Sequence, residues 1–230
     1  MLNFFFTYNS EYESYEPTIA GYTALCILML LILLTCVFIT GKKQKKINTT
    51  ELTFCSISLA LAFVTGTFIK LFRMPMGGSV TLCSMLFITL IGYWYGLRVG
   101  LMTAFAYGLL QFVTNPWIIS VPQVFFDYIF AYGSLGLSGI FRNSKHGILK
   151  GYLTGVFGRF VFSFLSGIIF FAAASAAAGA EYGLNLPGYS AVCNGAYLGA
   201  EAAITVAVIM IPPVNKALKY VKVMALGNRQ

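Results

Sequence analysis

Three ionisable residues stand inside long apolar runs of this 230-residue sequence. Asp127 lies in "QVFFDYIFAY", Arg159 in "VFGRFVFSFLSG" and Glu201 in "YLGAEAAITV". In membrane-spanning segments, charged side chains are unfavourable unless they face the interior of the protein, and they usually mark a site. These positions are therefore the first candidates for function.

Asp127 has aromatic residues on both sides, namely Phe125, Phe126, Tyr128 and Tyr132. A carboxylate among aromatic rings suits a cationic ligand, because the ring faces and the negative charge both attract it. Taken alone, the stretch fits equally well an interfacial aromatic belt whose acid reaches water.

Arg159 and Glu201 both lie near the middle of their apolar runs. Arg159 is too deep to reach water easily, so it must find acceptors inside a bundle. Glu201 could pair with Arg159 as a structural bridge or could contact a ligand directly. The sequence leaves both possibilities open.

Ser163, Gly167 and Phe171 follow Arg159 at intervals of four, so they share one helix face. Small residues on that face would let a ligand approach, or would simply let two helices pack closely.

The last apolar run adds Tyr189 and Asn194 in its outer half. A tyrosine at a helix start is commonly interfacial. An asparagine deeper in the run needs a partner, because an unpaired amide in hydrocarbon costs several kcal/mol.

The sequence carries no motif of an enzyme. H-E-x-x-H, G-x-S-x-G and the P-loop are absent, and the single histidine, His146, lies in a basic loop. The five cysteines have no metal-ligand spacing and are typical of apolar packing residues. We expect no catalysis, no metal and no cofactor.

The composition identifies the elements that must position these residues. Hydrophobic residues make up 58% of the chain and charged residues 10%, against about 25% in soluble domains. The mean hydropathy is +0.80. An all-α integral membrane protein follows, because a span needs about 20 apolar residues. The sequence predicts seven spans, at about 19–41, 50–71, 80–95, 99–114, 122–141, 150–176 and 189–213.

The basic residues predict the orientation. The first span has acidic residues before it and "KKQKK" at 42–46 after it, which predicts an external N-terminus. Alternation then puts the C-terminus in the cytoplasm and leaves only Lys70, Arg73 and Arg159 off the cytoplasmic side. The net charge of +8 therefore indicates topology and contact with membrane lipid, with no nucleic acid. Besides the four lysines of 42–46, the cytoplasmic set is Arg98, Arg142, Lys145, Lys150, Lys216, Lys219, Lys222 and Arg229.

Two irregular segments are predicted to cover the outer mouth of the site. "RMPMGGSVTL" at 73–82 contains Gly77, Gly78 and Ser79, and its glycines would let the backbone fold over a pocket. The other segment carries Trp117 after Asn115-Pro116. The sequence leaves open whether these loops close on a ligand.

Four stretches occur in the order of a known family. "RMPMGGSVTLCSMLFITLIGYWYGLRVG", "QVFFDYIFAYGSLGLSGIF", "SGIIFF" and "YSAVCNG" resemble the thiamine-specific substrate-binding component (S-component) of energy-coupling factor (ECF) transporters, over about 52–213. The resemblance implies a six-helix bundle at 49–230. Residues 1–48, an N-terminal transmembrane anchor and a basic linker, are an addition to the family's usual six helices. It also implies a multi-pass protein of the bacterial plasma membrane.

The resemblance implies high-affinity binding of thiamine from outside, with a separate coupling (T) subunit and two ATPase subunits as partners. A thiamine precursor or analogue, or another vitamin, is the alternative ligand. A membrane enzyme or scaffold built on a helical bundle is the alternative class. The family's binding positions fall on Asp127, Tyr128, Arg159, Ser163, Gly167, Phe171, Tyr189 and Asn194.

Four of these positions depart from the family pattern. Asp127 replaces the usual Glu and Arg159 the usual Lys, while Ser163 and Phe171 stand where His and Trp stack on the ligand. Each lost stacking contact weakens binding by about 1 kcal/mol, which keeps the alternative ligands open.

S-components use small residues at four-residue spacing on the first core helix to meet the coupling subunit. Ser58, Ala62 and Gly66 have that spacing in "SLALAFVTG". Packing within the bundle is the alternative for this stripe.

Overall fold

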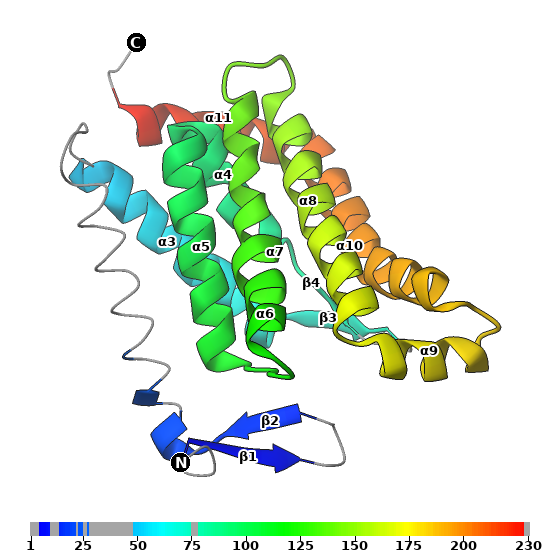
Figure 1. Cartoon of the computed structure of the whole chain (residues 1–230). Coiled ribbons are helices and arrows are strands. Elements are labelled where there is room, and N and C mark those ends of the chain that lie inside the picture. Colours follow the sequence, from blue (N-terminus) through cyan, green and yellow to red (C-terminus); the bar gives the residue numbers. More distant parts are fainter. Residues whose placement is uncertain are drawn as a thin grey trace.

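The computed structural model describes residues 5–9, 14–21, 23, 24, 27, 48–74 and 78–227 (Figure 1). Most of the predicted first span, the lysines at 42–46, Gly77 and Arg229 lie outside these residues. Near the N-terminus, β1 (Phe6–Asn9) and β2 (Ser14–Pro17) pair as an antiparallel hairpin.

Long apolar helices form the bundle, as the composition predicted. Those long enough to cross a bilayer are α3 (Thr49–Phe68), α5 (Leu97–Thr114), the run from α6 to η2 (Val121–Phe141), α8 (Gly147–Ile169) and α10 (Leu186–Met210). A shorter apolar helix, α4 (Ser84–Tyr95), lies among them. The prediction of an all-α membrane bundle with a six-helix core is confirmed.

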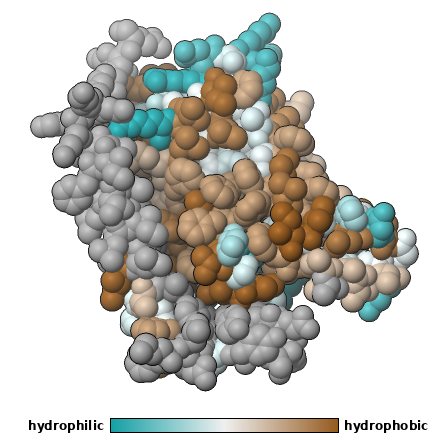
Figure 2. All heavy atoms as spheres, viewed as in Figure 1, coloured by the Kyte–Doolittle hydropathy of each residue, from teal (hydrophilic) through white to brown (hydrophobic). Residues whose placement is uncertain are grey.

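The surface of the bundle is apolar where lipid would surround it. Figure 2 shows hydrophobic residues over the flanks of the helices and hydrophilic residues gathered at the end of the bundle that is uppermost in the view. Large apolar side chains such as Phe157 on α8 and Phe68 on α3 are exposed. An exterior of this kind is stable in hydrocarbon rather than in water.

The centre of the bundle is formed by α4, whose Met85, Ile88 and Ile91 are fully buried. Close packing of backbones surrounds it. A Cβ placed on Gly100 of α5 or on Gly136 would lie within 2.6 Å of a backbone atom of the neighbouring element. Only glycine permits helices to approach this closely, and the approach gives the bundle a rigid wall.

The segment expected as one helix over 122–141 changes its pitch along its length. It begins with α6 (Val121–Val124), whose first turn is capped by Ser120, and continues as the π-helix η1 (Phe125–Phe130). It ends with α7 (Ala131–Gly133) and the 3₁₀-helix η2 (Ser134–Phe141). Asp127 lies in η1, and π-helical turns often occur at functional sites.

A hairpin replaces part of two predicted helices. β3 (Lys70–Arg73) pairs with β4 (Ser79–Thr81), with a bulge between Lys70 and Phe72. The predicted start of a helix at 80 is therefore wrong, because α4 begins only at Ser84. The hairpin crosses the end of the bundle where α3 finishes (Figure 1).

The two last predicted spans also end differently from the prediction. The helix expected over 150–176 stops at Ile169, and α9 (Ala172–Glu181) turns across the end of the bundle (Figure 1). After α10, Pro212 begins an unpredicted helix, α11 (Pro212–Leu226), at the opposite end. The Tyr95 hydroxyl donates to the Ala225 carbonyl at 2.9 Å and ties α11 to the bundle.

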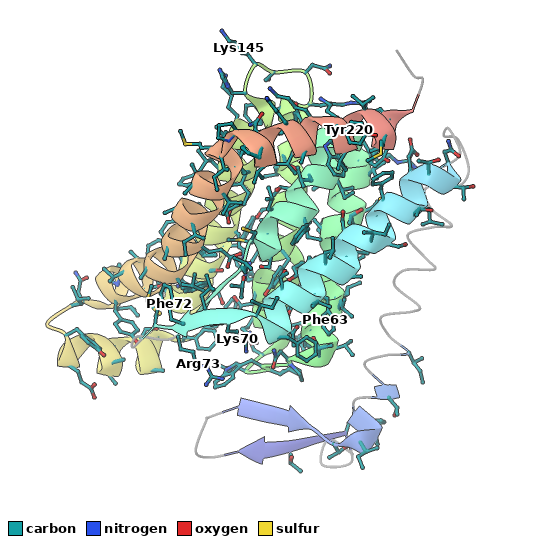
Figure 3. All side chains as sticks on the ribbon, turned by 180° about the vertical axis from the view of Figure 1, so that it is seen from behind. Phe63, Lys70, Phe72, Arg73, Lys145 and Tyr220 are labelled. Atoms are coloured by element: carbon teal, nitrogen blue, oxygen red, sulfur yellow. The ribbon has the colours of Figure 1, made fainter. Side chains whose placement is uncertain are left out.

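The two ends of the bundle differ in how many basic residues they carry. Lys145 and the helix that carries Tyr220 lie at one end, whereas Lys70 and Arg73 lie at the other (Figure 3). The first end also holds Arg142, whose guanidinium donates to the Tyr95 carbonyl at 3.5 Å. The hairpin, α6 and α9 therefore lie opposite the end where most basic residues gather.

Candidate functional site

Two adjoining cavities lie in the half of the bundle near the hairpin. The outer chamber has a volume of about 630 Å³ and the inner chamber about 260 Å³. Both are lined by Gly78, Tyr128, Tyr132, Arg159 and Tyr197, which form the boundary between them. A ligand could therefore extend from one chamber into the other.

The outer chamber gathers residues from η1, α8, α10 and the loops over its mouth. All eight positions predicted to bind a ligand line it, together with Gly78 and Trp117 from the predicted covering segments. Ser79 lines the inner chamber instead. The eight positions are Asp127, Tyr128, Arg159, Ser163, Gly167, Phe171, Tyr189 and Asn194.

Asp127 is held in place by Gln123, one turn earlier on the same helix face. The Gln123 amide donates to the Asp127 carboxylate at 2.6 Å and to the Trp117 carbonyl at 3.1 Å, and it accepts from the Ile119 amide at 3.1 Å. Gln123 is only 1% exposed. A buried glutamine thus fixes both the carboxylate and the loop at the mouth.

Only some of the aromatic residues that neighbour Asp127 in the sequence line the chambers. Tyr128 and Tyr132 line the chambers, but Phe125 is exposed on the outer surface. Phe126 packs behind, with its ring centroid 5.5 Å from that of Phe170. The other rings facing the outer chamber come from Trp117, Phe171, Tyr189 and Tyr197.

The Tyr128 hydroxyl holds the covering loop. It donates to the Asn115 carbonyl at 2.7 Å and accepts from the Trp117 amide at 2.9 Å. Since the hydroxyl is used in this way, the ring of Tyr128 rather than its oxygen is available to a ligand. Trp117 itself remains 43% exposed at the mouth.

Glu201 does not pair with Arg159 among the residues that the structure describes. Its carboxylate accepts hydrogen bonds from the Thr81 hydroxyl at 2.6 Å, the Thr81 amide at 3.2 Å, the Ser84 hydroxyl at 3.0 Å and the Met85 amide at 3.4 Å. Glu201 is 2% exposed. It thus joins β4 and the N-terminus of α4 to α10. A negative charge is favourable at the N-terminus of a helix such as α4.

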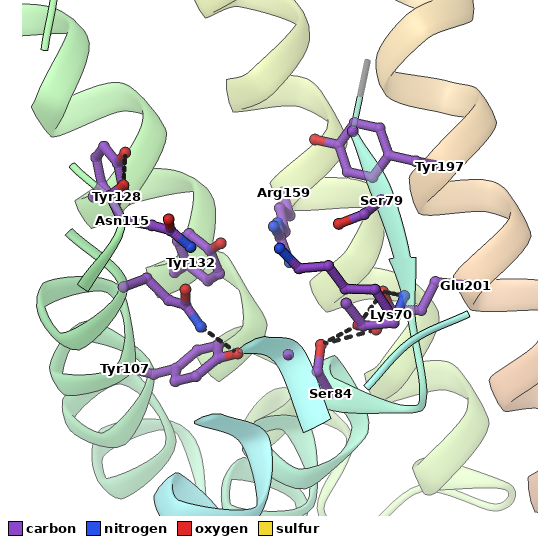
Figure 4. Close-up of a pocket in the computed structure, with 14 residues that line it drawn as sticks. Lys70, Ser79, Ser84, Tyr107, Asn115, Tyr128, Tyr132, Arg159, Tyr197 and Glu201 are labelled. Carbon is purple, nitrogen blue, oxygen red and sulfur yellow. Dashed lines mark hydrogen bonds between the residues drawn. The ribbon is translucent and has the colours of Figure 1, made fainter. Parts of the chain in front are cut away.

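Arg159 lines both chambers, and Figure 4 shows its side chain in the inner one. Its guanidinium carbon lies 4.1 Å from the centroid of the Tyr132 ring, a cation–π distance. Its Nε is buried and has no hydrogen-bond partner in the described part of the chain. Because Nε is enclosed, a ligand in the chambers could reach the guanidinium only through its two Nη groups.

Asn194 and Gly167 line the outer chamber and also serve packing. The Asn194 amide donates to the Ser190 carbonyl at 3.0 Å and accepts from the Tyr197 hydroxyl at 3.2 Å. A Cβ on Gly167 would overlap the Ser190 hydroxyl, so glycine lets α8 approach α10 here. The close packing of two helices that the sequence allowed at Gly167 is therefore observed, at a position that also lines the chamber.

Several residues that form or support the site were not identified from the sequence. Gln123 stands four residues before Asp127, and Tyr197 three after Asn194, so helical spacing could have indicated both. Tyr132 was noted only as a neighbour of Asp127, yet it faces both chambers. Lys70 carried no local signal, because its aim into the inner chamber depends on the hairpin.

The stripe predicted to meet a coupling subunit faces inward. Ser58 is buried and Ala62 is 0% exposed, with its carbonyl accepting from the Tyr107 hydroxyl at 3.1 Å. Gly66 lines the inner chamber. The structure therefore shows the alternative for Ser58, Ala62 and Gly66, which is packing within the bundle.

The described residues contain no group of three or more His, Cys, Asp and Glu that could hold a metal ion. The site is instead one of opposite charges, aromatic faces and hydrogen-bonding groups. Such a lining is suited to binding an organic ion.

Comparison with known proteins agrees with this geometry. The family model described as "Thiamine transporter protein (Thia_YuaJ)" matches residues 52–221. The thiamine transporter ThiT of Bacillus subtilis is 32% identical over 112 residues, which cover 48% of this chain and 55% of that protein. The match thus spans about half the length of this relative.

A solved structure of ThiT from Listeria monocytogenes is similar in fold. It superposes with a TM-score of 0.58 at 22% sequence identity and covers 74% of this chain and 93% of the other. At this identity the likeness concerns the fold of the bundle.

Proposed function

The chain belongs to the thiamine transporter protein family, and from that premise we propose that it binds thiamine as the S-component of an ECF importer. The observation that carries the proposal is the outer chamber, in which the Asp127 carboxylate stands among aromatic rings. The family is one of transporters, which agrees with the expectation that the chain is not an enzyme.

The chemistry of thiamine matches this chamber. Its thiazolium ring is a flat cation, which the Asp127 carboxylate and the ring faces attract together. Phe171, Tyr189 and Tyr197 offer further faces for its two rings. Arg159 and Asn194 add polar groups that could orient the pyrimidine.

The mouth of the site supports uptake from outside. It lies at the end of the bundle opposite α11 and the loop that carries Lys145. Because basic residues favour the cytoplasmic side, we propose that the mouth faces the exterior and the C-terminus the cytoplasm.

The partner surface is proposed to be the outward face of α3. Ser56 and Ala60 are exposed there at a spacing of four, beside Leu61, Val64 and Phe68. Phe68 is 73% exposed. A coupling subunit in the membrane could pack closely against the small residues of this face.

A bulky residue at Ala60 tests this surface. Ala60→Trp should abolish co-purification with a coupling subunit and its ATPases while leaving thiamine binding intact. Gly199→Trp on α10 is the matched control, because Gly199 is exposed and has nothing near it. Equal co-purification of both variants would show that the coupling subunit does not contact this face of α3.

A ligand panel tests the main proposal. The purified chain is titrated with thiamine, its pyrimidine half and its thiazole half by calorimetry, with Trp117 fluorescence as a second signal. We expect saturable binding of thiamine that is tighter than binding of either half. Absence of any binding below millimolar concentration would contradict the assignment.

The same panel addresses the alternative ligands. Ser163 and Phe171 offer less stacking area than the family pattern. If a precursor such as the pyrimidine half binds more tightly than thiamine, the site belongs to that precursor.

A further inference from the structure

The inner chamber carries an excess of positive charge that the outer chamber does not explain. Its charged lining residues are Lys70, Arg159 and Glu201 (Figure 4). They enter from three different elements, β3, α8 and α10. Two cations and one carboxylate leave the chamber with a net charge of +1.

The carboxylate is already engaged elsewhere. Glu201 accepts its hydrogen bonds from Thr81, Ser84 and Met85, on the side of β4 and α4. No ion pair joins it to Arg159 or Lys70 within the described ranges. It therefore lowers the repulsion between the two cations without using their donors.

The side chains of both cations line the cavity. The Arg159 Nε is buried and lacks a partner in the part of the chain that the structure describes. Figure 4 shows the Lys70 and Arg159 side chains reaching into the cavity between α5 and α10. The register of the hairpin shifts between Lys70 and Phe72, and bulges of this kind are common beside functional sites.

The rest of the lining is also rich in hydrogen-bonding groups. Ser79 and Asn115 face the chamber from the hairpin and from the loop after α5. Gln111 uses one amide hydrogen for the Tyr107 hydroxyl at 2.8 Å and keeps a second. A cavity of about 260 Å³ with these groups is far larger than the roughly 30 Å³ that one water occupies.

We propose that the inner chamber is a binding site for an oxyanion of the phosphate class, held by Arg159 and Lys70. Guanidinium presents paired donors that match a phosphate, and the ammonium adds a point charge. Two sources share this chemistry, a phosphate ester on a ligand whose cationic ring occupies the outer chamber, and free inorganic phosphate.

The ester arm of this inference rests on the proposed function, since it takes thiamine as the body of the ligand. The arrangement of charge fits a dipolar molecule, with Asp127 at the cationic end and Lys70 at the anionic end. Because Arg159 and Tyr197 border both chambers, one molecule could contact both ends.

The test compares three proteins by calorimetry in phosphate-free buffer: the unmodified chain, Lys70→Gln and Arg73→Gln. Arg73 is the matched control, because it is an exposed cation on the same strand and lines neither chamber. Each protein is titrated with thiamine, with thiamine monophosphate, and with thiamine in the presence of inorganic phosphate.

If the ester occupies the inner chamber, Lys70→Gln weakens binding of thiamine monophosphate about tenfold more than binding of thiamine. Arg73→Gln changes that ratio less than twofold. If free phosphate occupies it, phosphate changes the thiamine affinity of the unmodified chain and of Arg73→Gln but not of Lys70→Gln. The inference would be overturned if all three proteins responded in the same way to thiamine monophosphate and in the same way to inorganic phosphate.

A second measurement keeps the inference separate from the proposed function. The thermal unfolding midpoint is recorded with inorganic phosphate and with chloride at equal ionic strength, without thiamine. Stabilisation by phosphate that Lys70→Gln loses and Arg73→Gln keeps supports the chamber even if thiamine does not bind. Equal midpoints in both salts, together with an unchanged ester ratio, would refute it while leaving thiamine binding untouched.

Discussion

In the outer chamber the Asp127 carboxylate accepts a hydrogen bond from Gln123 and faces the cavity, whereas the Glu201 carboxylate at the inner chamber is enclosed by donors from Thr81, Ser84 and Met85. The two acids come from similar apolar surroundings in the sequence. Their difference lies in the partners that the fold brings to them.

Structural and ligand-binding charged residues in a membrane bundle differ in whether other protein groups already use their hydrogen-bonding atoms. A carboxylate whose oxygens are occupied by fixed donors stabilises the fold. A carboxylate that lies beside a cavity and can still accept hydrogen bonds is available to a ligand. Arg159 follows the second pattern, because it lines both chambers and forms no ion pair with Glu201 in the described chain.

The largest expected effect comes from breaking the enclosed carboxylate. Glu201→Gln would replace an acceptor oxygen by an amide that meets the donors of Thr81 and Ser84. We expect the free energy of unfolding to fall by about 2–4 kcal/mol. Thermal unfolding without ligand measures it, with the exposed Glu181→Gln as control. Equal midpoints for the two variants would show that Glu201 is not structural.

The next largest effect is expected on thiamine affinity, from removing the charge of Asp127. Asp127→Asn keeps the shape of the side chain and removes its charge, so thiamine affinity should fall about 10- to 100-fold. The unfolding midpoint without ligand should change little. Calorimetric titration measures the affinity, and an affinity unchanged by the substitution would remove this carboxylate from the binding site.

A smaller effect is expected at the covering loop. Tyr128→Phe removes the hydroxyl that bonds Asn115 and Trp117 while keeping the ring. Thiamine affinity should fall about three- to tenfold because the loop loses its anchor. Protease cleavage near Trp117 should also become faster. Unaltered cleavage and affinity would mean that the loop is held by other contacts.

The smallest effect is a gain. Phe171→Trp enlarges one aromatic face of the outer chamber and should tighten thiamine binding by up to about tenfold. Phe157→Trp on the exposed flank of α8 is the control, because it adds the same group outside the site. A loss of affinity in Phe171→Trp would indicate that this wall has no room for a larger ring.

The fold and much of the site could be predicted because polar residues in apolar runs are informative in a membrane protein. Asp127, Arg159 and Asn194 were identified from their depth, and helical spacing added Ser163, Gly167 and Phe171 to the same wall. The family resemblance joined these positions to Tyr189 at one site, and they line one chamber.

The remainder depends on contacts that no local pattern records. The break after Ile169 and the hairpin of Lys70 arise from long-range packing. The partners of Glu201 are more than a hundred residues away in the sequence. The inward direction of Ala62 was likewise undecidable, because small residues at a spacing of four suit both faces of α3.

A thermodynamic cycle that removes charge from the protein and from the ligand shows whether Asp127 pairs with the cation. Affinities of the unmodified chain and of Asp127→Asn are measured for thiamine and for an analogue whose thiazolium is replaced by a neutral ring of the same shape. If Asp127 pairs with the cation, the substitution should weaken binding of thiamine at least about tenfold more than binding of the analogue. Equal losses for both ligands would contradict the account.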